Sequence, residues 1–337
     1  MTAPLDHQLI AALQLHPRIS WTRLGEVLAS DPTTLSRRWQ TLVEAGLVWS
    51  TCFEMAPTPR DNPVRAGLVE VGCVPGRREQ VIDALSRERL VYDITCTTGD
   101  RDLAVLVSGP SLGAVDDLVQ RRVASQDGVT RTRTSLLHTI FRDGPGWRLA
   151  ALSPAQIAAI TAALPVREPV PTPTALHRDL IAALNPDPRI TVSDLAARLG
   201  SSTSTVSRGL EVLLTAPWAR FRTDLAHTRL GWEAEVTLWL RTESGTLPEV
   251  VTSLRAMDHL RMCASISGPA NLTAVFWLRH LHDLDALEHR LLRAHPSVRI
   301  LDRWVTTRVA KRLGHVLDAD GLHRDWVPIG VPAGPLV

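Results

Sequence analysis

Hydroxyl and guanidinium side chains gather at two places along the chain. The first group comprises Thr33, Thr34, Ser36, Arg37 and Arg38, and the second comprises Ser202, Thr203, Ser204, Thr205, Ser207 and Arg208. Serine and threonine hydroxyls bind phosphate oxygens or base edges, and an arginine can donate two parallel hydrogen bonds to a phosphate or to guanine. The same residue types also serve as helix caps and as solvated surface charges. Their role therefore depends on the elements that carry them.

The residues around the first group predict three short helices. Leucine and isoleucine recur at helical spacing over residues 5–14, and Ser20 can cap a second helix. Asp31 followed by Pro32 is a favoured start for a third helix, and Gly46 predicts its end. Three such helices form a helix-turn-helix, whose third helix presents its first turns to the major groove. We therefore expect double-stranded DNA as a partner.

The chain also contains an internal repeat. Three segments recur in register: residues 9–13 as 180–184, 17–20 as 188–191, and 34–37 as 205–208. A period this long indicates duplication of a whole unit and not a solenoid. Between the copies, residues 165–173 hold four prolines, which predicts an extended linker.

After each group of helices the pattern changes to strands. Residues 47–53 predict a wing or linker strand, and the order βαββαβ follows in both copies. In the first copy we expect strands at 68–71, 90–97, 103–107 and 129–140, with helices at 77–87 and 112–124. In the second copy we expect strands at 235–240, 260–267, 272–278 and 298–307, with helices at 247–257 and 281–294.

These elements predict an α+β protein. It has two winged or helix-turn-helix three-helix domains and two ferredoxin-like βαββαβ domains, with helices on one face of each sheet. The expected divisions are 1–50 and 174–222 for the helix-turn-helix domains, 51–145 and 223–310 for the ferredoxin-like domains, 146–173 for a helix and proline-rich linker, and 311–337 for a C-terminal helix and tail.

This order of elements resembles the Lrp/AsnC family of transcription regulators. The resemblance rests on Leu5-Asp6, Arg18-Ile19-Ser20, Leu24, Ser36-Arg37-Arg38 and the run from Leu42 to Val48. It implies a sequence-specific DNA-binding regulator that responds to an amino acid or related metabolite and assembles as a homo-oligomer. The two copies can also pair within one chain, which places two unlike reading helices on one imperfectly symmetric operator.

The resemblance also points to an effector loop. In that family a Gly-x-x-Asp loop lies near the small molecule, and here it corresponds to Thr98, Gly99, Asp100 and Asp102, with Gly268 and Asn271 in the second copy. A glycine lets backbone N–H groups approach a carboxylate, and an aspartate can pair with an ammonium group. The alternative is an ordinary hairpin turn, which glycine and aspartate also favour.

The second reading helix differs from the first. Gly209 stands where the first copy has Arg38, which removes a charge and weakens the helix by about 1 kcal/mol relative to alanine. Pro217 replaces the glycine that ends the first helix. We therefore hypothesise that the first copy dominates base readout and the second adds mostly backbone affinity.

The composition of the chain limits where it can bind nucleic acid and which other classes of protein it can belong to. The chain has 337 residues and a net charge of +2, so a nucleic-acid site must be local. Its short apolar runs and its first residues predict no membrane span and no export, hence a cytoplasmic, nucleoid-associated protein. The four cysteines form no close pair. We expect the polar stretch 280–289 to be a solvated helix face, and we expect no metal and no cofactor.

Two alternative functions remain open. Siroheme decarboxylases resemble Lrp/AsnC proteins in fold and can be fused tandem units, but Tyr92 is the single tyrosine and the loop at 97–100 has no cluster of histidine and tyrosine. We therefore expect no enzyme. The second alternative is a metabolite-binding module whose helix-turn-helix units no longer read DNA. It predicts weak, salt-sensitive binding without sequence preference.

Overall fold

A computed structural model describes residues 4–54, 65–143, 147–165, 172–185 and 187–330. The chain forms two compact units. The helical unit draws on residues 1–62 and 148–226, and the β-ring unit draws on residues 63–147 and 227–337. Among the described residues, no helix is long and apolar enough to cross a membrane.

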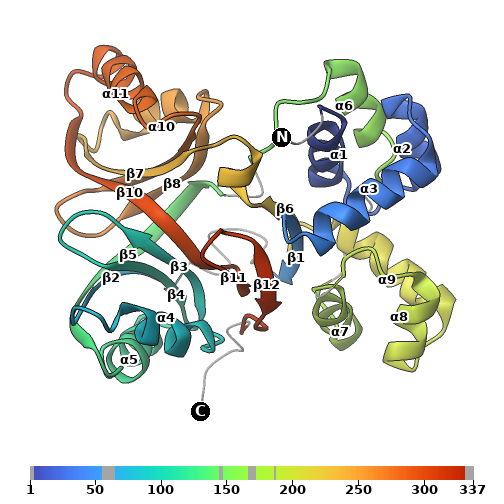
Figure 1. Ribbon diagram of the computed structural model, residues 1–337, viewed down its shortest axis with the longest axis horizontal. Helices are drawn as coiled ribbons and strands as arrows, with labels where there is room; N and C mark the ends of the chain where they lie inside the picture. The colour runs from blue at the N-terminus through green and yellow to red at the C-terminus, as the bar shows by residue number, and fades with distance from the viewer. Residues whose placement is uncertain (1–3, 55–64, 144–146, 166–171, 186, 331–337) are drawn as a thin grey trace. The chain divides into compact units, whose positions relative to one another are not determined.

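The helical unit contains two three-helix bundles and a two-stranded ribbon (Figure 1). Its elements are α1 (Pro4–Leu15), α2 (Trp21–Leu28), α3 (Pro32–Glu44), β1 (Val48–Glu54), α6 (Pro154–Thr161), α7 (Ala175–Leu184), α8 (Val192–Leu199), α9 (Thr203–Thr215) and β6 (Ala219–Leu225). We call α1–α3 the first bundle and α7–α9 the second bundle.

Capping residues set the limits of helices in the first bundle. The side chains of Ser20 and Asp31 accept hydrogen bonds from the N–H groups of Arg23 and Thr34, at the starts of α2 and α3. Gly46 takes the left-handed conformation at φ 68° and ends α3. These boundaries confirm the expected caps and stop.

The second bundle uses the same devices with different residues. Thr174, Thr191 and Ser202 cap α7, α8 and α9 through their hydroxyls. At the end of α9, Ala216 adopts an extended conformation because it precedes Pro217, which disfavours the helical region. The helix therefore ends without a left-handed glycine. The core of the second bundle consists of Leu180, Ile181, Leu184, Leu195, Val206, Leu210, Leu213 and Trp218 with smaller neighbours.

Strands β1 and β6 join the two bundles as an antiparallel ribbon. Val48 pairs with Leu225 at one end and Glu54 pairs with Ala219 at the other. Inside the ribbon, the hydroxyls of Ser50 and Thr223 lie 3.0 Å apart. The expected strand at 47–53 is therefore a linker strand, paired with its counterpart from the second half of the chain.

The β-ring unit repeats the order βαββαβ. Its first half contains β2 (Ala66–Cys73), α4 (Arg78–Ser86), β3 (Val91–Thr97), β4 (Leu103–Ser108), α5 (Leu112–Leu118) and β5 (Val129–Arg142). Its second half contains β7 (Ala234–Arg241), α10 (Leu247–Arg255), β8 (Leu260–Ile266), β9 (Leu272–Leu278), α11 (Asp283–Ala294) and β10 (Arg299–Arg312). These bounds agree with the expected elements to within a few residues, with two exceptions. A π-helical turn, Val119–Val123, continues α5 and completes the helix expected over 112–124, and β10 runs on to Arg312.

Two long strands close the sheets into a ring. The strand β5 pairs first with β2 and then, from Leu137 onward, with β8. In the same way β10 pairs first with β7 and then, from Thr306 onward, with β3. The eight strands β3, β4, β2, β5, β8, β9, β7 and β10 thus follow one another without a free edge.

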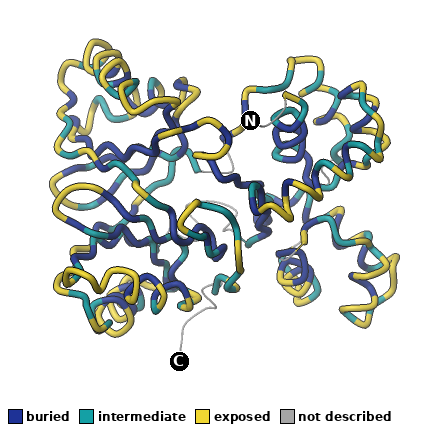
Figure 2. Tube along the Cα trace, in the orientation of Figure 1, coloured by how far each residue is buried: buried dark blue, intermediate teal, exposed yellow. Residues whose placement is uncertain are grey.

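Each side of the ring has its own apolar core. Alternate side chains of a strand point to opposite faces. Val105 therefore packs beneath α4 and α5, whereas Ala104 and Leu106 pack in the interior of the ring. The interior cluster also contains Trp239 and Trp304. Figure 2 shows the result, with buried strands and exposed outer faces on the helices.

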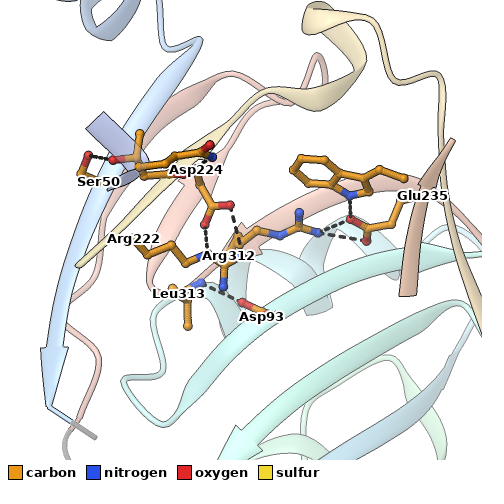
Figure 3. Close-up of polar contacts among 10 residues, drawn as sticks. Ser50, Asp93, Arg222, Asp224, Glu235, Arg312 and Leu313 are labelled. Carbon is orange, nitrogen blue, oxygen red and sulfur yellow. Dashed lines mark hydrogen bonds and ion pairs between the residues drawn. The ribbon is translucent and has the colours of Figure 1, made fainter. Parts of the chain in front are cut away.

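A buried ion pair lies within the second half of the ring unit. The Arg312 guanidinium donates two hydrogen bonds to the Glu235 carboxylate, at 2.7 and 2.9 Å (Figure 3). The indole N–H of Trp277 donates a third, and the ring of His227 stacks on Trp277. Burial alone raises the pKa of Glu235, but Arg312, His227 and these hydrogen bonds lower it to about 2.

Residues 311–337 differ from expectation. Among the described residues of this stretch there is no helix, and strands β11 (His315–Leu317) and β12 (His323–Trp326) form instead. Leu313 and Gly314 both have positive φ, at 45° and 85°, which is the geometry of a two-residue hairpin turn. This turn folds β11 back onto the end of β10. Most of the expected proline-rich linker, residues 166–171, lies outside the described residues.

The ion pair predicts an acid-sensitive core. Because the pKa of Glu235 is lower in the folded state than its ordinary value of 4.5, the pair stabilises the fold above that value and loses this effect as the pH falls toward 2. We expect the free energy of unfolding to fall by on the order of 2 kcal/mol more in the wild-type chain than in a Glu235→Gln/Arg312→Met variant, between about pH 5 and pH 3. Urea unfolding followed by tryptophan fluorescence measures this. An equal loss in both proteins would contradict it.

Candidate functional site

The third helix of the first bundle turns one face to solvent. Leu35 and Trp39 point inward, whereas Thr33 and Arg37 are exposed. Thr34, Ser36 and Arg38 are partly exposed. The expected DNA-facing residues of this copy therefore lie along the first turns of α3. Within the described part of the chain, no side chain pairs with the Arg37 guanidinium, which leaves all its donors available.

The helix α9 presents the same kind of surface. Thr203, Ser204 and Arg208 are exposed, and Thr205 and Ser207 are partly exposed. Arg208 lies at the position of Arg37, and its Nε donates only to the carbonyl of Ser204 in its own helix. The hydroxyl of Ser202 accepts from Thr205 N at 3.1 Å. Ser202 thus has a capping role within the fold.

The capping residues give the two helices different charges. Asp31 fills in the first bundle the position that Ser202 fills in the second. An exposed aspartate places a negative charge beside the first turn of α3, whereas the serine leaves the first turn of α9 without one. Since the N-terminus of a helix favours anions, α9 offers the more favourable surface for a phosphate.

Arg38 has an internal partner. Its Nη1 donates to Oδ1 of Asp6 in α1 at 3.0 Å, and the Asp6 side chain is 12% exposed. In the second bundle both partners are exchanged together, for Gly209 and His177. A Cβ at Gly209 would lie 2.5 Å from Cδ1 of Leu180, so the glycine lets α9 approach α7 closely.

The surroundings of Gly209 correct the argument that its exchange for Arg38 weakens DNA reading by α9. The charge that the second bundle lacks is the partner of an internal carboxylate in the first, and the two charges disappear together. Gly209 itself is buried. This position therefore gives no reason to expect weaker reading by α9, and Arg37 and Arg208 remain as matched exposed arginines.

The first candidate effector loop connects β3 to β4. Gly99 has a positive φ of 98°, and Asp100 beside it is exposed. Thr98 accepts a hydrogen bond from Val305 N at the junction of β3 with β10. Asp102 accepts one from Cys73 N at 2.7 Å and thereby fixes the end of β2. The structure thus brings these residues into one turn, but the side chains of Thr98 and Asp102 form hydrogen bonds within the fold.

The second loop, between β8 and β9, repeats this arrangement. Gly268 has a φ of 119°, and Asn271 accepts from Thr242 N at 3.0 Å, as Asp102 does from Cys73 N. Asn271 also donates to the carbonyl of Thr242. The exchange of aspartate for asparagine therefore keeps the acceptor that the turn requires. The hairpin role explains Asp102 and Asn271, whereas Asp100 has no counterpart carboxylate.

Sequence reasoning missed Arg101, which lies inside the first loop. Its side chain is only 6% exposed and forms ion pairs with Glu70 and Asp302, from the two halves of the ring. Its guanidinium also stacks on the ring of Trp304 at 4.3 Å. The flanking aspartates made the stretch look like a solvated turn. Only the pairing of β3 with β10 reveals that this arginine points inward.

Other reactive groups are few within the described ranges. No group of three or more histidines, cysteines and carboxylates there could hold a metal ion. The four cysteines are free thiols. Burial raises the pKa of Cys73 to about 11 and that of Cys263 to about 12, so both thiols stay protonated at neutral pH.

Two family models match the first part of the chain. Residues 4–43 match the AsnC-type helix-turn-helix domain, which covers the first bundle nearly to its end. Residues 67–145 match the Lrp/AsnC ligand binding domain, which covers β2 to β5. Among curated proteins, an uncharacterized HTH-type transcriptional regulator of Pyrococcus horikoshii is 23% identical over 145 residues, which are 42% of this chain and 88% of that protein. One from Pyrococcus abyssi is 21% identical over the same shares.

Among solved structures, the siroheme decarboxylase NirDL resembles the chain over nearly its full length. The match has a TM-score of 0.56 at 13% identity and covers 91% of this chain and 93% of that one. At this identity the likeness concerns the fold alone. The chain thus contains an AsnC-type helix-turn-helix domain followed by an Lrp/AsnC ligand binding domain, within a mixed α+β fold.

Proposed function

We propose that this protein is a sequence-specific DNA-binding transcription regulator of the Lrp/AsnC type. In this proposal the chain is a tandem duplication whose second bundle also reads DNA. One observation carries it: Arg37 and Arg208 occupy matching exposed positions on α3 and α9, each in the third helix of a capped three-helix bundle. Neighbouring hydroxyls supply the additional hydrogen bonds that such a surface needs.

The chemistry of reading would follow from this arrangement. With α3 in a major groove, Thr33 and Thr34 lie near the helix start, where phosphates bind, and Arg37 follows one turn later. An arginine there can donate two hydrogen bonds to O6 and N7 of guanine. Because the first turns of α3 and α9 carry few exposed arginines, we expect binding to depend on salt less steeply than in a strongly basic protein.

The ring unit supports the tandem proposal. Each half has the same strand order, and each long strand crosses to the edge of the other half. Thr98 and Ser267 even fill matching roles, since each accepts a hydrogen bond at one ring junction. In this proposal the pairing of two equal domains takes place within one chain, and further homo-oligomers would form through outer surfaces.

We further propose that a small metabolite with an ammonium group acts as effector at the first loop. Asp100 supplies an exposed carboxylate beside the positive-φ turn at Gly99. The second loop has Pro269 at the matching position, so it would not hold an ammonium group in the same way. An effector would therefore occupy the two halves unequally.

The enzyme alternative rests on the likeness of the fold to siroheme decarboxylase NirDL. Tyr92 does not favour it, because its hydroxyl donates to the carbonyl of Gly330 at 2.7 Å and is held within the fold. Adding siroheme to the purified protein separates the proposals. A regulator leaves the absorbance of siroheme unchanged, whereas a stoichiometric spectral shift with decarboxylation would replace our proposal by the enzyme.

The regulator proposal predicts which arginines matter for DNA. Against a DNA sequence selected by the wild-type chain, Arg37→Ala and Arg208→Ala should each lower affinity by roughly 5- to 150-fold, because each removes a contact worth about 1–3 kcal/mol. Arg38→Ala should mainly lower the free energy of unfolding, by about 1 kcal/mol or less, since its partner is Asp6. Fluorescence anisotropy and urea unfolding measure the two effects.

Arg178→Ala is the matched control, because it removes an exposed ion pair with Glu54 elsewhere in the helical unit. It should leave affinity unchanged. If neither Arg37→Ala nor Arg208→Ala weakens binding while both variants stay folded, the reading surface has been assigned to the wrong face.

The effector proposal separates the two aspartates of the loop. Calorimetry with a panel of amino acids should identify a ligand of the wild-type chain, and Asp100→Ala should weaken it by about tenfold or more through loss of a charged hydrogen bond. Asp102→Asn should keep both binding and stability, because an asparagine accepts from Cys73 N as Asn271 does from Thr242 N. An unchanged titration for Asp100→Ala would remove the loop from the site.

A further inference from the structure

Two arginines join the bundles of the helical unit reciprocally. Arg18 lies between α1 and α2, and its Nη2 donates to the carbonyl of Ile190 at 2.8 Å, while its Nη1 donates to Pro188. Arg189 lies between α7 and α8 and donates to the carbonyls of Pro17 and Ile19, at 2.7 and 2.8 Å. Each guanidinium thus binds the two carbonyls that flank the other arginine. We call this set of four hydrogen bonds the arginine clasp.

The clasp holds two like charges in a partly buried place. Burial and, to a smaller extent, the charge of Arg18 together lower the pKa of Arg189 to about 10, and Asp187 opposes both effects. Burial also lowers the pKa of Arg18. Both groups remain charged at neutral pH, so their burial is tolerated only while the carbonyls accept their hydrogen bonds. Sliding one bundle along the other would break this matched geometry.

Trp21 adds to the clasp on one side. Its ring lies against the guanidinium of Arg189, with 3.9 Å from the carbon to the ring centroid. The corresponding residue of the second bundle is Val192, so Arg18 has no matching aromatic contact. Arginine is better suited than lysine to such a place, because a planar guanidinium can stack and donate two parallel hydrogen bonds at once.

The position of the clasp connects it to the reading helices. Arg18 comes two residues before Ser20, the cap of α2, and Arg189 comes two residues before Thr191, the cap of α8. The helices that begin there pack against α3 and α9, and the β1–β6 ribbon joins the bundles at a second place. Two separate connections restrict rotation of one bundle against the other.

We propose that the arginine clasp fixes the spacing between α3 and α9 and thereby selects the half-site spacing of the DNA. This inference rests on the proposed function as a DNA reader. Arg18 and Arg189 are positioning residues, because backbone carbonyls of the opposite bundle accept hydrogen bonds from both their guanidinium groups. A rigid spacing raises the effective concentration of the second helix at its half-site only when the spacing of the DNA matches.

The test uses the full chain and a DNA sequence that the wild type selects from a random pool. Affinity is measured for the selected site, for sites with one or two base pairs added or removed between the half-sites, and for a single half-site. For the wild type we expect about a tenfold loss or more when the spacing changes. For Arg18→Lys/Arg189→Lys, which keeps both charges but not the paired donors, we expect less than about threefold variation over the same series.

The single half-site distinguishes positioning from general damage. Its affinity should be unchanged in the double lysine variant, because the clasp contacts no DNA, and Arg178→Ala should keep the full spacing preference. If the double variant does not fold, Arg18→Lys alone is measured in the same series, with a preference intermediate between the two.

Two results would overturn the inference in distinguishable ways. A folded clasp variant that keeps the wild-type spacing profile refutes the clasp and leaves the proposed function intact. A wild-type chain that selects no DNA sequence refutes the proposed function, and the clasp proposal fails with it.

Discussion

The structure of the β-ring unit depends on one constraint, which is that neither βαββαβ half can cover both faces of its own sheet. Helices cover the outer face of each half, and the inner face carries apolar side chains such as Leu106, Trp239 and Trp304. Exposed sheet edges would also invite pairing with other chains. Closing two halves into one ring buries both inner faces together and leaves no edge within the eight strands. The strands β5 and β10, each 14 residues long, are long enough to serve both halves.

The two halves of the chain share roles more closely than they share residues. Asp102 and Asn271 both fix the end of a strand, and Thr98 and Ser267 both accept a hydrogen bond where the ring closes. In the helical unit, Arg18 and Arg189 exchange contacts reciprocally. Residues differ between the two halves at two kinds of position. At the first kind the side chain only contacts other parts of the fold, and at the second a ligand could bind to one half and not to the other. The exchange of Asp6 and Arg38 for His177 and Gly209 is of the first kind, and Asp100 facing solvent in one half alone is of the second.

Local signals in the sequence were sufficient for most of the fold. Caps such as Ser20 and Asp31 and the stop at Gly46 act over a few residues, so the boundaries that they predict agree with the structure. Runs of β-prone residues likewise indicated the strands. The hairpin at Leu313 and Gly314 was missed because a leucine with positive φ leaves no recognisable signal.

The candidate sites were harder to predict, because their side chains find partners far away in the sequence. Nothing near Arg38 indicates that its guanidinium reaches Asp6, and nothing near Arg101 indicates its contacts with Glu70 and Asp302. The arginine clasp depends on two loops, α1–α2 and α7–α8, which are distant in the chain and meet only when the two bundles pack together. The sequence could nominate exposed arginines as a class, but the structure was needed to separate Arg37 and Arg208 from those held by internal partners.

The central claim is that the two bundles bind one DNA site together, with α3 and α9 each contacting one half-site. Hydroxyl-radical footprinting of the wild-type chain on its selected DNA tests this claim most directly. The account predicts two protected segments on one face of the duplex, about one helical turn or a multiple of it apart, with unequal sequences because α3 and α9 differ. A single protected segment, or uniform protection of any DNA without sequence preference, would contradict it.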